Sequence, residues 1–400
     1  MTVASGLEVL CAERLDLCRG RRVSVLCHPA SVDVQLVHVV DRLMAAGVRP
    51  VRLFGPEHGV RGEAQDMVSV EGERDGRTGI AVTSLYGQSL ESLQPTREAL
   101  ADTDLLLVDL QDIGSRYYTF IWTMALSMQA ATGAGVAVVV LDRPNPIGGT
   151  AVEGGEVQKG YESFVGLASL PVRHGLTIGE VARLVRAGIP WGGPRFAAPL
   201  DLDLTVVSMR GWRRHDSFEA TGLSWVLPSP NMPTVDTAFV YPGLCLVEGT
   251  NVSEGRGTTR PFEIIGAPFI DGFRLAERLA GHQLPGVHFR PLWFRPTFHK
   301  FAGQVCGGIQ VHVTDRAVFQ PYRCGIAILR ELREVGGEAF RWRREAYEFV
   351  SDRLAIDLLT GSDAIRTGIE RDLSLAELEA TWSLAQRRFA ERRQPHLLYE

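Results

Sequence analysis

The sequence lacks the short motifs that mark several common classes of enzyme. No glycine-rich GxGxxG turn follows the first expected strand, where the residues read CHPAS at 27–31, so a dinucleotide cofactor is not expected. The ten histidines show no HExxH motif or other short paired spacing, which argues against a metal site. Without a GxSxG turn or a Walker loop, serine-nucleophile hydrolysis and nucleoside-triphosphate chemistry are also disfavoured. We therefore predict a protein that uses neither a metal nor a cofactor.

Long hydrophobic runs and closely spaced cysteines are also absent. The longest apolar run, about residues 134–141, is far shorter than the roughly 20 residues that span a membrane. Glu8 and Glu13 interrupt the N-terminal segment, so it does not form the apolar core of a signal peptide. The six cysteines form no CxxC pair and fit buried apolar positions better than a disulfide framework. These features predict a cytoplasmic protein with no membrane span.

No strong excess of charge of either sign is present. The chain has 42 Lys and Arg against 47 Asp and Glu, which gives a net charge of -5 at pH 7. This balance argues against nucleic acid or an anionic membrane as the main partner. An apolar fraction of 45% and a charged fraction of 22% lie near globular averages, so disorder is not expected. Nothing in the sequence fixes an oligomeric state.

What is present in the first part of the chain is an alternation of strands and helices. Short apolar runs at 22–27, 48–54, 104–110 and 135–141 predict strands, and residues 34–46 and 119–131 predict intervening helices. Strands that are apolar throughout and separated by helices are typical of a parallel sheet covered on both faces. The expected fold class is therefore α/β with a doubly wound parallel sheet.

A second, smaller domain is expected after residue 190. Residues 190–199 contain three prolines and two glycines and predict a hinge, so we divide the 400 residues into domains 1–190 and 191–400. The later part predicts a strand near 308–313 and two C-terminal helices, which together suggest a mixed α+β domain that closes a cleft. Thr177 with Glu180 and Ser374 with Glu377 match capping boxes that begin helices.

Charged side chains follow three of the expected strands at the point where each strand ends. In open parallel sheets, ligands bind beyond the carboxyl ends of the strands. The side chains at these ends are Glu57 and His58, Asp112 and Arg116, and Asp142 and Arg143. We therefore expect carboxylates and basic side chains to lie together at the carboxyl ends of these strands.

Glu57 is the most specific of these candidates, because Gly55, Pro56 and Gly59 flank it in an unusual turn. A carboxyl group that is held out of solvent can act as a general acid near neutral pH. The alternative interpretation is that Glu57 only caps the turn.

The run that follows the most apolar strand suits a sugar. Tyr117 and Tyr118 lie next to Asp112 and Arg116, so aromatic rings can stack on a sugar while charged groups bind its hydroxyls. The alternative here is an Asp–Arg salt bridge that closes the turn between strand and helix.

Residues 248–263 form the most polar segment, with three Glu, two Arg, three Thr, one Asn and one Ser. Such a segment buries little apolar surface, so we interpret it as a binding loop in which Arg256 or Arg260 holds an acidic ligand. Together with the strand ends it supplies the paired carboxyl groups that glycoside hydrolysis requires.

Several of these motifs resemble the exo-β-N-acetylmuramidase (NamZ-type) family, and the similarity runs nearly from end to end. The matching motifs are FGPEHG at 54–59, SLYG at 84–87, DLQDIGSRYYT at 109–119, LDRPNP at 141–146, VEG at 152–154, HGLTIGE at 174–180, PSPNMPT at 228–234, the segment 248–263, HVTDR at 312–316 and LLY at 397–399. The resemblance implies a Rossmann-like domain, a smaller second domain and an active site in the cleft between them. It also implies release of terminal N-acetylmuramic acid from peptidoglycan fragments without a nicotinamide cofactor.

The resemblance places Glu57 at the position of the family's leading catalytic glutamate. Our hypothesis is that Glu57 protonates the glycosidic oxygen and that His58 or Arg116 orients it. A second carboxylate, Glu254 ahead of Asp112 and Glu153, then stabilises or attacks the anomeric carbon. The remaining expected contacts to a muramyl sugar are a lactyl-binding arginine and three polar side chains, namely Arg256 or Arg260, Tyr117, Asn231 and Asn251.

Three alternatives remain open at this point. The first is an NAD-dependent glycosidase, which the missing GxGxxG turn disfavours. The second is a non-catalytic protein that binds muramyl sugars, and the third is an etherase that releases lactate from the same sugars.

Overall fold

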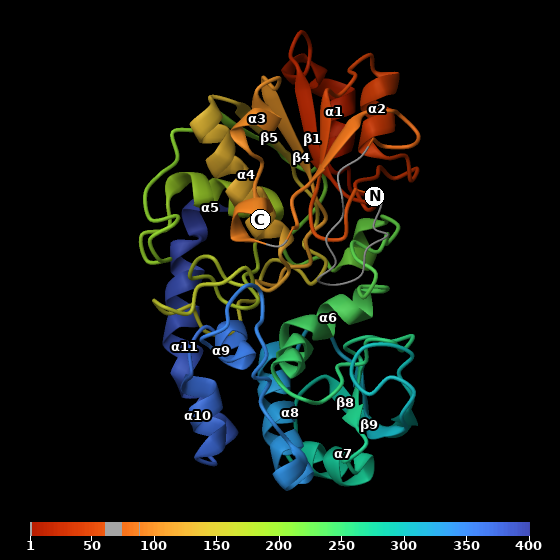
Figure 1. The fold of residues 1–400 in the computed structure, drawn as a ribbon, viewed down its shortest axis with the longest axis vertical. Coiled ribbons are helices and arrows are strands. Elements are labelled where there is room, and N and C mark those ends of the chain that lie inside the picture. The colour runs from red at the N-terminus through yellow and green to blue at the C-terminus, as the bar shows by residue number, and fades with distance from the viewer. Residues whose placement is uncertain (1, 61–73, 88) are drawn as a thin grey trace.

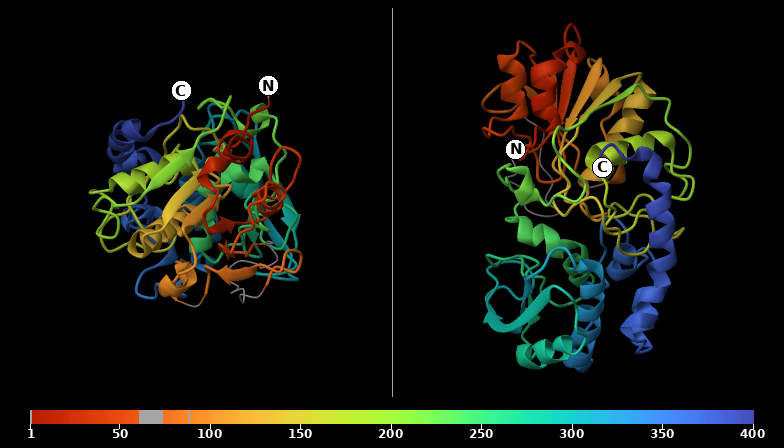
Figure 2. Two further views of the ribbon diagram at one scale, coloured as in Figure 1. Left: turned by 90° about the horizontal axis from the view of Figure 1, so that it is seen from above. Right: turned by 180° about the vertical axis from the view of Figure 1, so that it is seen from behind.

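The computed structural model describes residues 2–60, 74–87 and 89–400. These residues form two lobes stacked along the long axis of the molecule, with the N-terminal half in the upper lobe of Figure 1. A long C-terminal helix runs along the side of both lobes, which Figure 2 shows from behind.

The upper lobe is built on a parallel sheet with the strand order β3-β2-β1-β4-β5-β6 (Figure 1). Its strands are β1 (Val23–Cys27), β2 (Arg52–Gly55), β3 (Ala81–Ser84), β4 (Leu105–Asp109), β5 (Ala137–Leu141) and β6 (Leu204–Val207). The direction of winding reverses between β1 and β4, as it does in the Rossmann fold. The predicted α/β class with a doubly wound parallel sheet is therefore confirmed.

Helices cover both faces of the sheet. Successive side chains of a strand point to opposite faces, so strands that are apolar throughout present an apolar surface on each face. Leu105 and Leu107 of β4 pack in the core that includes the first two helices, whereas Leu106 and Val108 pack in the core that includes the next three. These helices are α1 (Gly6–Glu13), α2 (Val39–Ala45), α3 (Arg97–Leu100), α4 (Phe120–Ala134) and α5 (Ile178–Ala187). Both layers leave the carboxyl ends of the strands directed toward the second lobe (Figure 1).

The lower lobe contains a smaller antiparallel sheet with the order β7-β9-β8 and several helices. Its strands are β7 (Ile264–Ala267), β8 (Val287–Phe294) and β9 (Cys306–Val313). The helices that follow β6 are α6 (Val235–Leu244), α7 (Gly272–Ala280), α8 (Pro321–Gly336), α9 (Ala355–Thr360), α10 (Ala364–Glu370) and α11 (Leu375–Arg392). The expected second, smaller α+β domain is thus present, and α6 lies at the junction of the two lobes (Figure 1).

The backbones of α6 and α8 meet at two glycines. A Cβ atom on Gly243 would lie 1.9 Å from the carbonyl oxygen of Pro321, and one on Gly325 would lie 2.2 Å from the carbonyl oxygen of Gly243. Only glycine allows this approach, so α6 is fixed against α8 and its side chains face the junction in one orientation.

The end of the chain returns to the upper lobe. The Tyr399 hydroxyl donates to Asp142 Oδ2 at 2.6 Å, and Thr177 and the Gly179 N–H also donate to this carboxylate. Arg143, the neighbouring strand-end residue, pairs with buried Asp109 at 2.5 Å. Asp142 and Arg143, which follow β5, therefore make contacts that stabilise the fold.

Strands β3 and β6 were not expected from the sequence. Strand β6 follows the proline-rich residues 190–199 and pairs with β5, so part of the first sheet comes from beyond residue 190. Both predicted capping boxes are present, at Thr177 for α5 and at Ser374 for α11. Within the described ranges, no helix is both long enough and apolar enough to cross a membrane.

Candidate active site at the junction of the lobes

Glu57 and His58 lie in a tight turn directly after β2. The Gly59 N–H donates to the Pro56 carbonyl at 3.0 Å, and His58 has a φ of 73°, in the left-handed region that strains a non-glycine residue. A Cβ atom on Gly55 would lie 2.8 Å from the Val60 nitrogen, so close packing also restricts the start of the turn. The backbone therefore holds the Glu57 side chain in place, as its flanking residues predict.

The two carboxylate oxygens of Glu57 have different surroundings. Oε2 accepts a hydrogen bond from the Thr119 hydroxyl at 2.9 Å, and Thr119 immediately precedes α4. Oε1 is buried and has no hydrogen-bond partner among the residues that the structure describes. One oxygen is thus positioned by the protein, and the other is available to a ligand.

Glu57 lines a small cavity to which both lobes contribute. The cavity has a volume of about 40 Å³, which is room for one or two waters, so it forms the inner end of a site and not a space for a whole sugar. Its walls are Glu57, His58, Tyr117, Tyr118, Thr119, Phe120, Ser229, Asn231, Met232, Tyr241, Arg256 and Phe262. Five of the predicted site residues, Glu57, His58, Tyr117, Asn231 and Arg256, are therefore brought together here.

Arg256 forms the side of this cavity that belongs to the polar segment 248–263. Its Nη2 pairs with Glu248 Oε1 at 2.8 Å, and its Nε lies 3.4 Å from Glu254 Oε1. The guanidinium also lies over the ring of Phe262, 5.1 Å from its centroid. Contacts of this kind fix the plane of the guanidinium group, which is what recognition of a planar carboxylate requires.

Glu254 stands behind Arg256 and does not line the cavity. Its carboxylate is fully buried. The Lys300 ammonium lies 2.9 Å from Oε2, and the His299 Nδ1 atom lies 3.3 Å from Oε1. Burial alone raises the pKa of Glu254, but Lys300, His299 and Arg256 together hold it well below its ordinary value. Glu254 is therefore ionised in the folded protein and positions Arg256.

Asp112 and Tyr118 lie in the loop after β4, and of the two only Tyr118 lines the Glu57 cavity. Asp112 Oδ2 accepts from the Gly114 N–H at 2.7 Å, whereas Oδ1 has no hydrogen-bond partner in the described part of the chain. Burial raises the pKa of Tyr118 well above its ordinary value, and the carboxylates of Asp112 and Glu57 add to this effect. The charge of Arg256 acts in the opposite direction and lowers the pKa of Tyr118.

A buried histidine supports Asp112. The His174 Nδ1 atom accepts from the Leu176 N–H at 3.1 Å, so we assign the ring proton to Nε2, which lies 3.6 Å from Asp112 Oδ2. Neither the sequence motifs nor the spacing had singled out this contact.

Arg116 and Arg260 lie outside the Glu57 cavity. Fully buried Arg116 donates to the carbonyls of Gly155, Leu170 and Leu359 at 2.5–2.6 Å and does not pair with Asp112. Arg260 is half exposed and pairs with Glu263 at 3.2 Å. Of the two arginines expected to bind an acidic ligand, only Arg256 therefore lines the Glu57 cavity.

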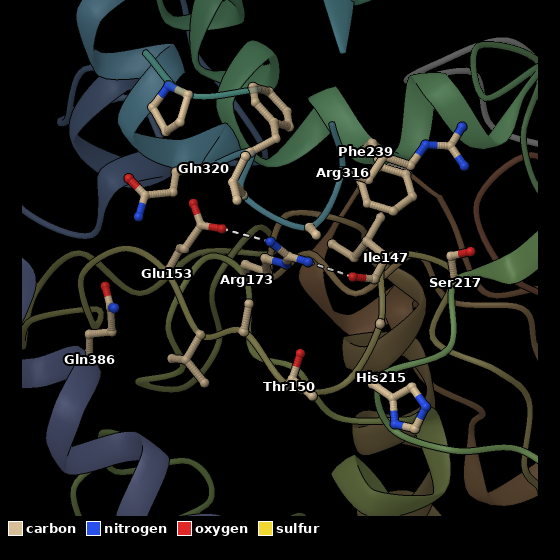
Figure 3. Close-up of a pocket in the computed structure, with 17 residues that line it drawn as sticks. Ile147, Thr150, Glu153, Arg173, His215, Ser217, Phe239, Arg316, Gln320 and Gln386 are labelled. Atoms are coloured by element: carbon tan, nitrogen blue, oxygen red, sulfur yellow. Dashed lines mark hydrogen bonds and ion pairs between the residues drawn. The ribbon is translucent and has the colours of Figure 1, made fainter. Parts of the chain in front are cut away.

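Glu153 lies in a different and larger cavity of about 840 Å³ between the lobes (Figure 3). Its carboxylate pairs with Arg173 at 2.8 Å, and Arg173 donates in turn to the Ile147 carbonyl at 2.5 Å. Phe239 of α6 lines this cavity, whereas Tyr241 of the same helix lines the Glu57 cavity. The two cavities are therefore on opposite sides of α6, and Glu153 is separated from Glu57.

Asn251 lies in a third cavity, on the lower lobe. Its side-chain nitrogen donates to the Ala339 carbonyl and its oxygen accepts from the Arg341 N–H, each at 2.9 Å. This cavity also contains His299 and Lys300, the partners of Glu254.

Sequence reasoning did not assign roles to Thr119, Ser229, Tyr241, His299 or Lys300. One signal could have identified Lys300: the chain has 42 Lys and Arg residues, and only Lys159 and Lys300 among them are lysines. The other four are common residue types at unremarkable spacings, and only the fold brings them to the site.

The fold and the site together define an α/β protein with a ligand site at the junction of two lobes. A Rossmann-like lobe and a smaller mixed lobe enclose a glutamate, an arginine and several aromatic rings at the carboxyl ends of the parallel strands, where α/β proteins bind ligands. Among the described residues, no group of His, Cys, Asp and Glu side chains is arranged to hold a metal ion.

Comparison with known proteins gives the family. Residues 23–236 match the family model described as the N-terminal domain of exo-beta-N-acetylmuramidase NamZ, and residues 239–399 match the corresponding C-terminal domain. The chain therefore belongs to the NamZ family, and the resemblance seen in its motifs is confirmed.

Individual relatives agree with this assignment. The chain is 42% identical over 398 residues to the peptidoglycan beta-N-acetylmuramidase NamZ of Bacillus subtilis (strain 168), which covers 99% of this chain and 91% of the relative. Crystal structures of two DUF1343 family proteins from Bacteroides fragilis NCTC 9343 share the fold. Their TM-scores are 0.87 and 0.78 at 33% and 27% identity, and each match covers 100% of this chain and 99% of the other.

The buried charge of Glu254 predicts a specific dependence of stability on pH. A carboxyl group whose folded pKa is lowered stabilises the fold above its unfolded pKa, and this contribution is lost as the pH falls through the folded pKa. Glu254→Gln should therefore be less stable than the wild type at neutral pH. The difference should narrow progressively below pH 4.5, the ordinary pKa of the group.

Urea denaturation of both proteins across this pH range measures the difference in the free energy of unfolding. Glu277→Gln, on an exposed position of α7, is the matched control and should show no such trend. A Glu254→Gln difference that stays constant with pH would show that Glu254 is not held ionised.

Proposed function

We propose that this protein is an exo-acting glycoside hydrolase that releases terminal β-linked N-acetylmuramic acid from peptidoglycan fragments. The observation that carries the proposal is Glu57 Oε1, a buried carboxylate oxygen without a described partner, which shares a cavity with Arg256. Membership of the NamZ family and the name of the Bacillus subtilis relative support the same reaction.

Glu57 acts as the general acid in this proposal. The protonated carboxyl group transfers its proton to the glycosidic oxygen while the bond from that oxygen to the anomeric carbon breaks. The remainder of the fragment leaves as an alcohol, and water completes the hydrolysis at the anomeric carbon. Thr119 is a positioning residue, because its hydroxyl fixes Oε2 and so directs Oε1 into the cavity.

Asp112 is the better candidate for the second carboxylate. A group that stabilises or attacks the anomeric carbon needs a carboxylate oxygen that the protein has not already paired with a cation. Asp112 Oδ1 meets this condition within the described residues, whereas Glu254 is engaged by three cationic side chains. Glu254 then serves to hold Arg256, and Glu153 belongs to the separate cavity on the other side of α6.

Arg256 is the residue proposed to bind the lactyl carboxylate, the group that distinguishes muramic acid from glucosamine. It lines the Glu57 cavity and its guanidinium plane is fixed by Glu248 and Phe262. The aromatic rings of Tyr117, Tyr118 and Tyr241 and the amide of Asn231 supply the remaining apolar and polar contacts to the sugar.

The direct test uses a disaccharide of N-acetylmuramic acid β-linked to N-acetylglucosamine, with mass spectrometry of the products. Free N-acetylmuramic acid and N-acetylglucosamine are expected, with one solvent oxygen incorporated from ¹⁸O-labelled water. Release of lactate would instead indicate an etherase, and binding without turnover would indicate a sensor. Loss of activity on exhaustive dialysis, restored by NAD, would indicate the nicotinamide-dependent alternative.

Replacing Glu57 by Gln should lower kcat on this disaccharide by about 10²-fold or more, the usual contribution of general-acid catalysis. Gln keeps the shape of the side chain and its hydrogen bond from Thr119 but does not transfer a proton. Steady-state kinetics of the folded variant measure the effect, and Glu277→Gln is the matched control. Near wild-type kcat in Glu57→Gln would remove Glu57 from the mechanism.

Arg256→Ala should reduce the preference for terminal N-acetylmuramic acid over terminal N-acetylglucosamine, and Arg260→Ala should not. Losing a charge-assisted contact to the lactyl carboxylate costs roughly 2–5 kcal/mol. At about 1.4 kcal/mol per tenfold, the ratio of kcat/KM values should fall by tens to thousands.

Paired chromogenic muramic and glucosamine substrates give this ratio directly, and a partly unfolded population does not change it. Arg256→Lys, which keeps the charge without the fork, should retain an intermediate preference. An unchanged ratio in both Arg256 variants would assign recognition of the lactyl group to another side chain.

A further inference from the structure

The third cavity, the one on the lower lobe that contains Asn251, His299 and Lys300, lies directly behind the Glu254 carboxylate. It has a volume of about 810 Å³, within the range of small-molecule binding sites. Its walls come from three separate loops of the chain and are Thr250, Asn251, His299, Lys300, Phe301, Arg341, Trp342, Arg343, Arg344 and Glu345. None of these side chains lines the Glu57 cavity.

The cavity is strongly cationic in a protein whose net charge is -5. Lys300 and three arginines line it together with one acidic side chain, that of Glu345, and Lys300 is also paired with Glu254. Within the described residues, Arg341, Arg343 and Arg344 form no ion pair. Arg341 donates to the Phe340 carbonyl, and Arg343 lies over the ring of Tyr347 at 5.0 Å. Positive charge that is gathered in a concave surface and not neutralised by the protein favours an anionic ligand.

Two aromatic side chains complete the walls. The Trp342 Nε1–H donates to Glu370 at 2.9 Å, which fixes the indole ring, and Phe301 is held in the left-handed region with a φ of 59°. His299 has a φ of 69°, so the lysine between them lies in a strained loop. Strain of this kind persists only where the surrounding structure imposes it, and it is frequent at ligand sites.

The Glu254 carboxylate separates this cavity from the Glu57 cavity. Lys300 approaches one oxygen at 2.9 Å from the side of the cationic cavity, and the Arg256 Nε lies 3.4 Å from the other oxygen. The polar segment 248–263 therefore forms a common wall, with Arg256 on one cavity and Thr250 and Asn251 on the other. The two cavities therefore adjoin opposite sides of one segment of the lower lobe.

We propose that the cationic cavity binds a carboxylate carried by the part of the peptidoglycan fragment beyond the terminal muramic acid. The inference rests on the proposed function, because it assumes that the glycosidic bond of a terminal muramyl sugar lies at Glu57. Two parts of a fragment carry such a group, the lactyl ether of the next muramyl unit and an acidic peptide attached to the lactyl group of that next unit. Both present a planar carboxylate, which arginine binds through paired hydrogen bonds.

Binding is measured by titration calorimetry in the Glu57→Gln background, so that the result does not depend on turnover. The three probes are the muramyl-glucosamine disaccharide, the tetrasaccharide with a second muramyl unit, and the same tetrasaccharide with a dipeptide that ends in a carboxylate on the lactyl group of its second muramyl unit. At least one extended probe should bind more tightly than the plain disaccharide. Its gain should weaken as the ionic strength rises, because the contact is electrostatic.

Arg344→Glu reverses one charge of the cavity at an exposed position. It should weaken binding of the extended probe relative to the disaccharide by about tenfold, the size expected for one charge-assisted contact. Arg290→Glu, on an exposed position of β8, is the matched control and should leave this ratio unchanged. The probe that responds identifies the source of the carboxylate.

The proposal is overturned if no extended probe binds better than the disaccharide, or if Arg344→Glu and Arg290→Glu give the same ratio. Failure of the proposed function has a different signature, since the wild-type protein would then not cleave the plain disaccharide whatever the cavity binds.

Discussion

The lower-lobe side of the site depends on one buried negative charge, the carboxylate of Glu254. A buried charge that loses its partners is strongly destabilising, so Lys300, His299 and Arg256 are held where Glu254 requires them. Arg256 is thereby presented to the Glu57 cavity and Lys300 to the cationic cavity. Glu248 extends the network, since it pairs with Arg256 and accepts the Tyr347 hydroxyl at 2.7 Å. A polar segment with few apolar side chains is thus ordered by these charges together with the burial of Val252 and Phe262 in the core.

Glu57 is held in the opposite way, and this difference separates its role from that of Glu254. Its described contacts include one hydroxyl donor and no cation, and the fixed turn after β2 positions its backbone. Two buried glutamates in one site can take separate roles when their surroundings differ in this manner. The glutamate surrounded by cations stays ionised and organises the site, and the glutamate with an available oxygen is the one suited to exchange a proton with a ligand.

The sequence predicted the parts of the fold and site that depend on local patterns. Continuous apolar runs gave the central strands, and Gly55, Pro56 and Gly59 indicated the held turn at Glu57. Strands β3 and β6 are short edge strands that are only partly buried, so their runs are too weakly apolar to detect. The domain boundary at 190 and 191 stays a prediction, because the proline content on which it rests does not report sheet pairing. The Lys300–Glu254 and His174–Asp112 contacts join residues 46 and 62 positions apart, which no local pattern reveals.

Arg116 shows why a strand-end position does not by itself give a residue a role at the ligand. It follows β4 as Asp112 does, but it does not line the Glu57 cavity, and its guanidinium donates to carbonyls that include that of Leu359 in α9. A buried guanidinium without these carbonyls would be left unsatisfied, so the contact holds α9 of the lower lobe against the upper lobe. The proton donor of the proposed reaction comes from the upper lobe and the lactyl-binding arginine from the lower lobe. The geometry of catalysis therefore depends on the junction that Arg116 maintains, even though Arg116 itself lies outside the cavity.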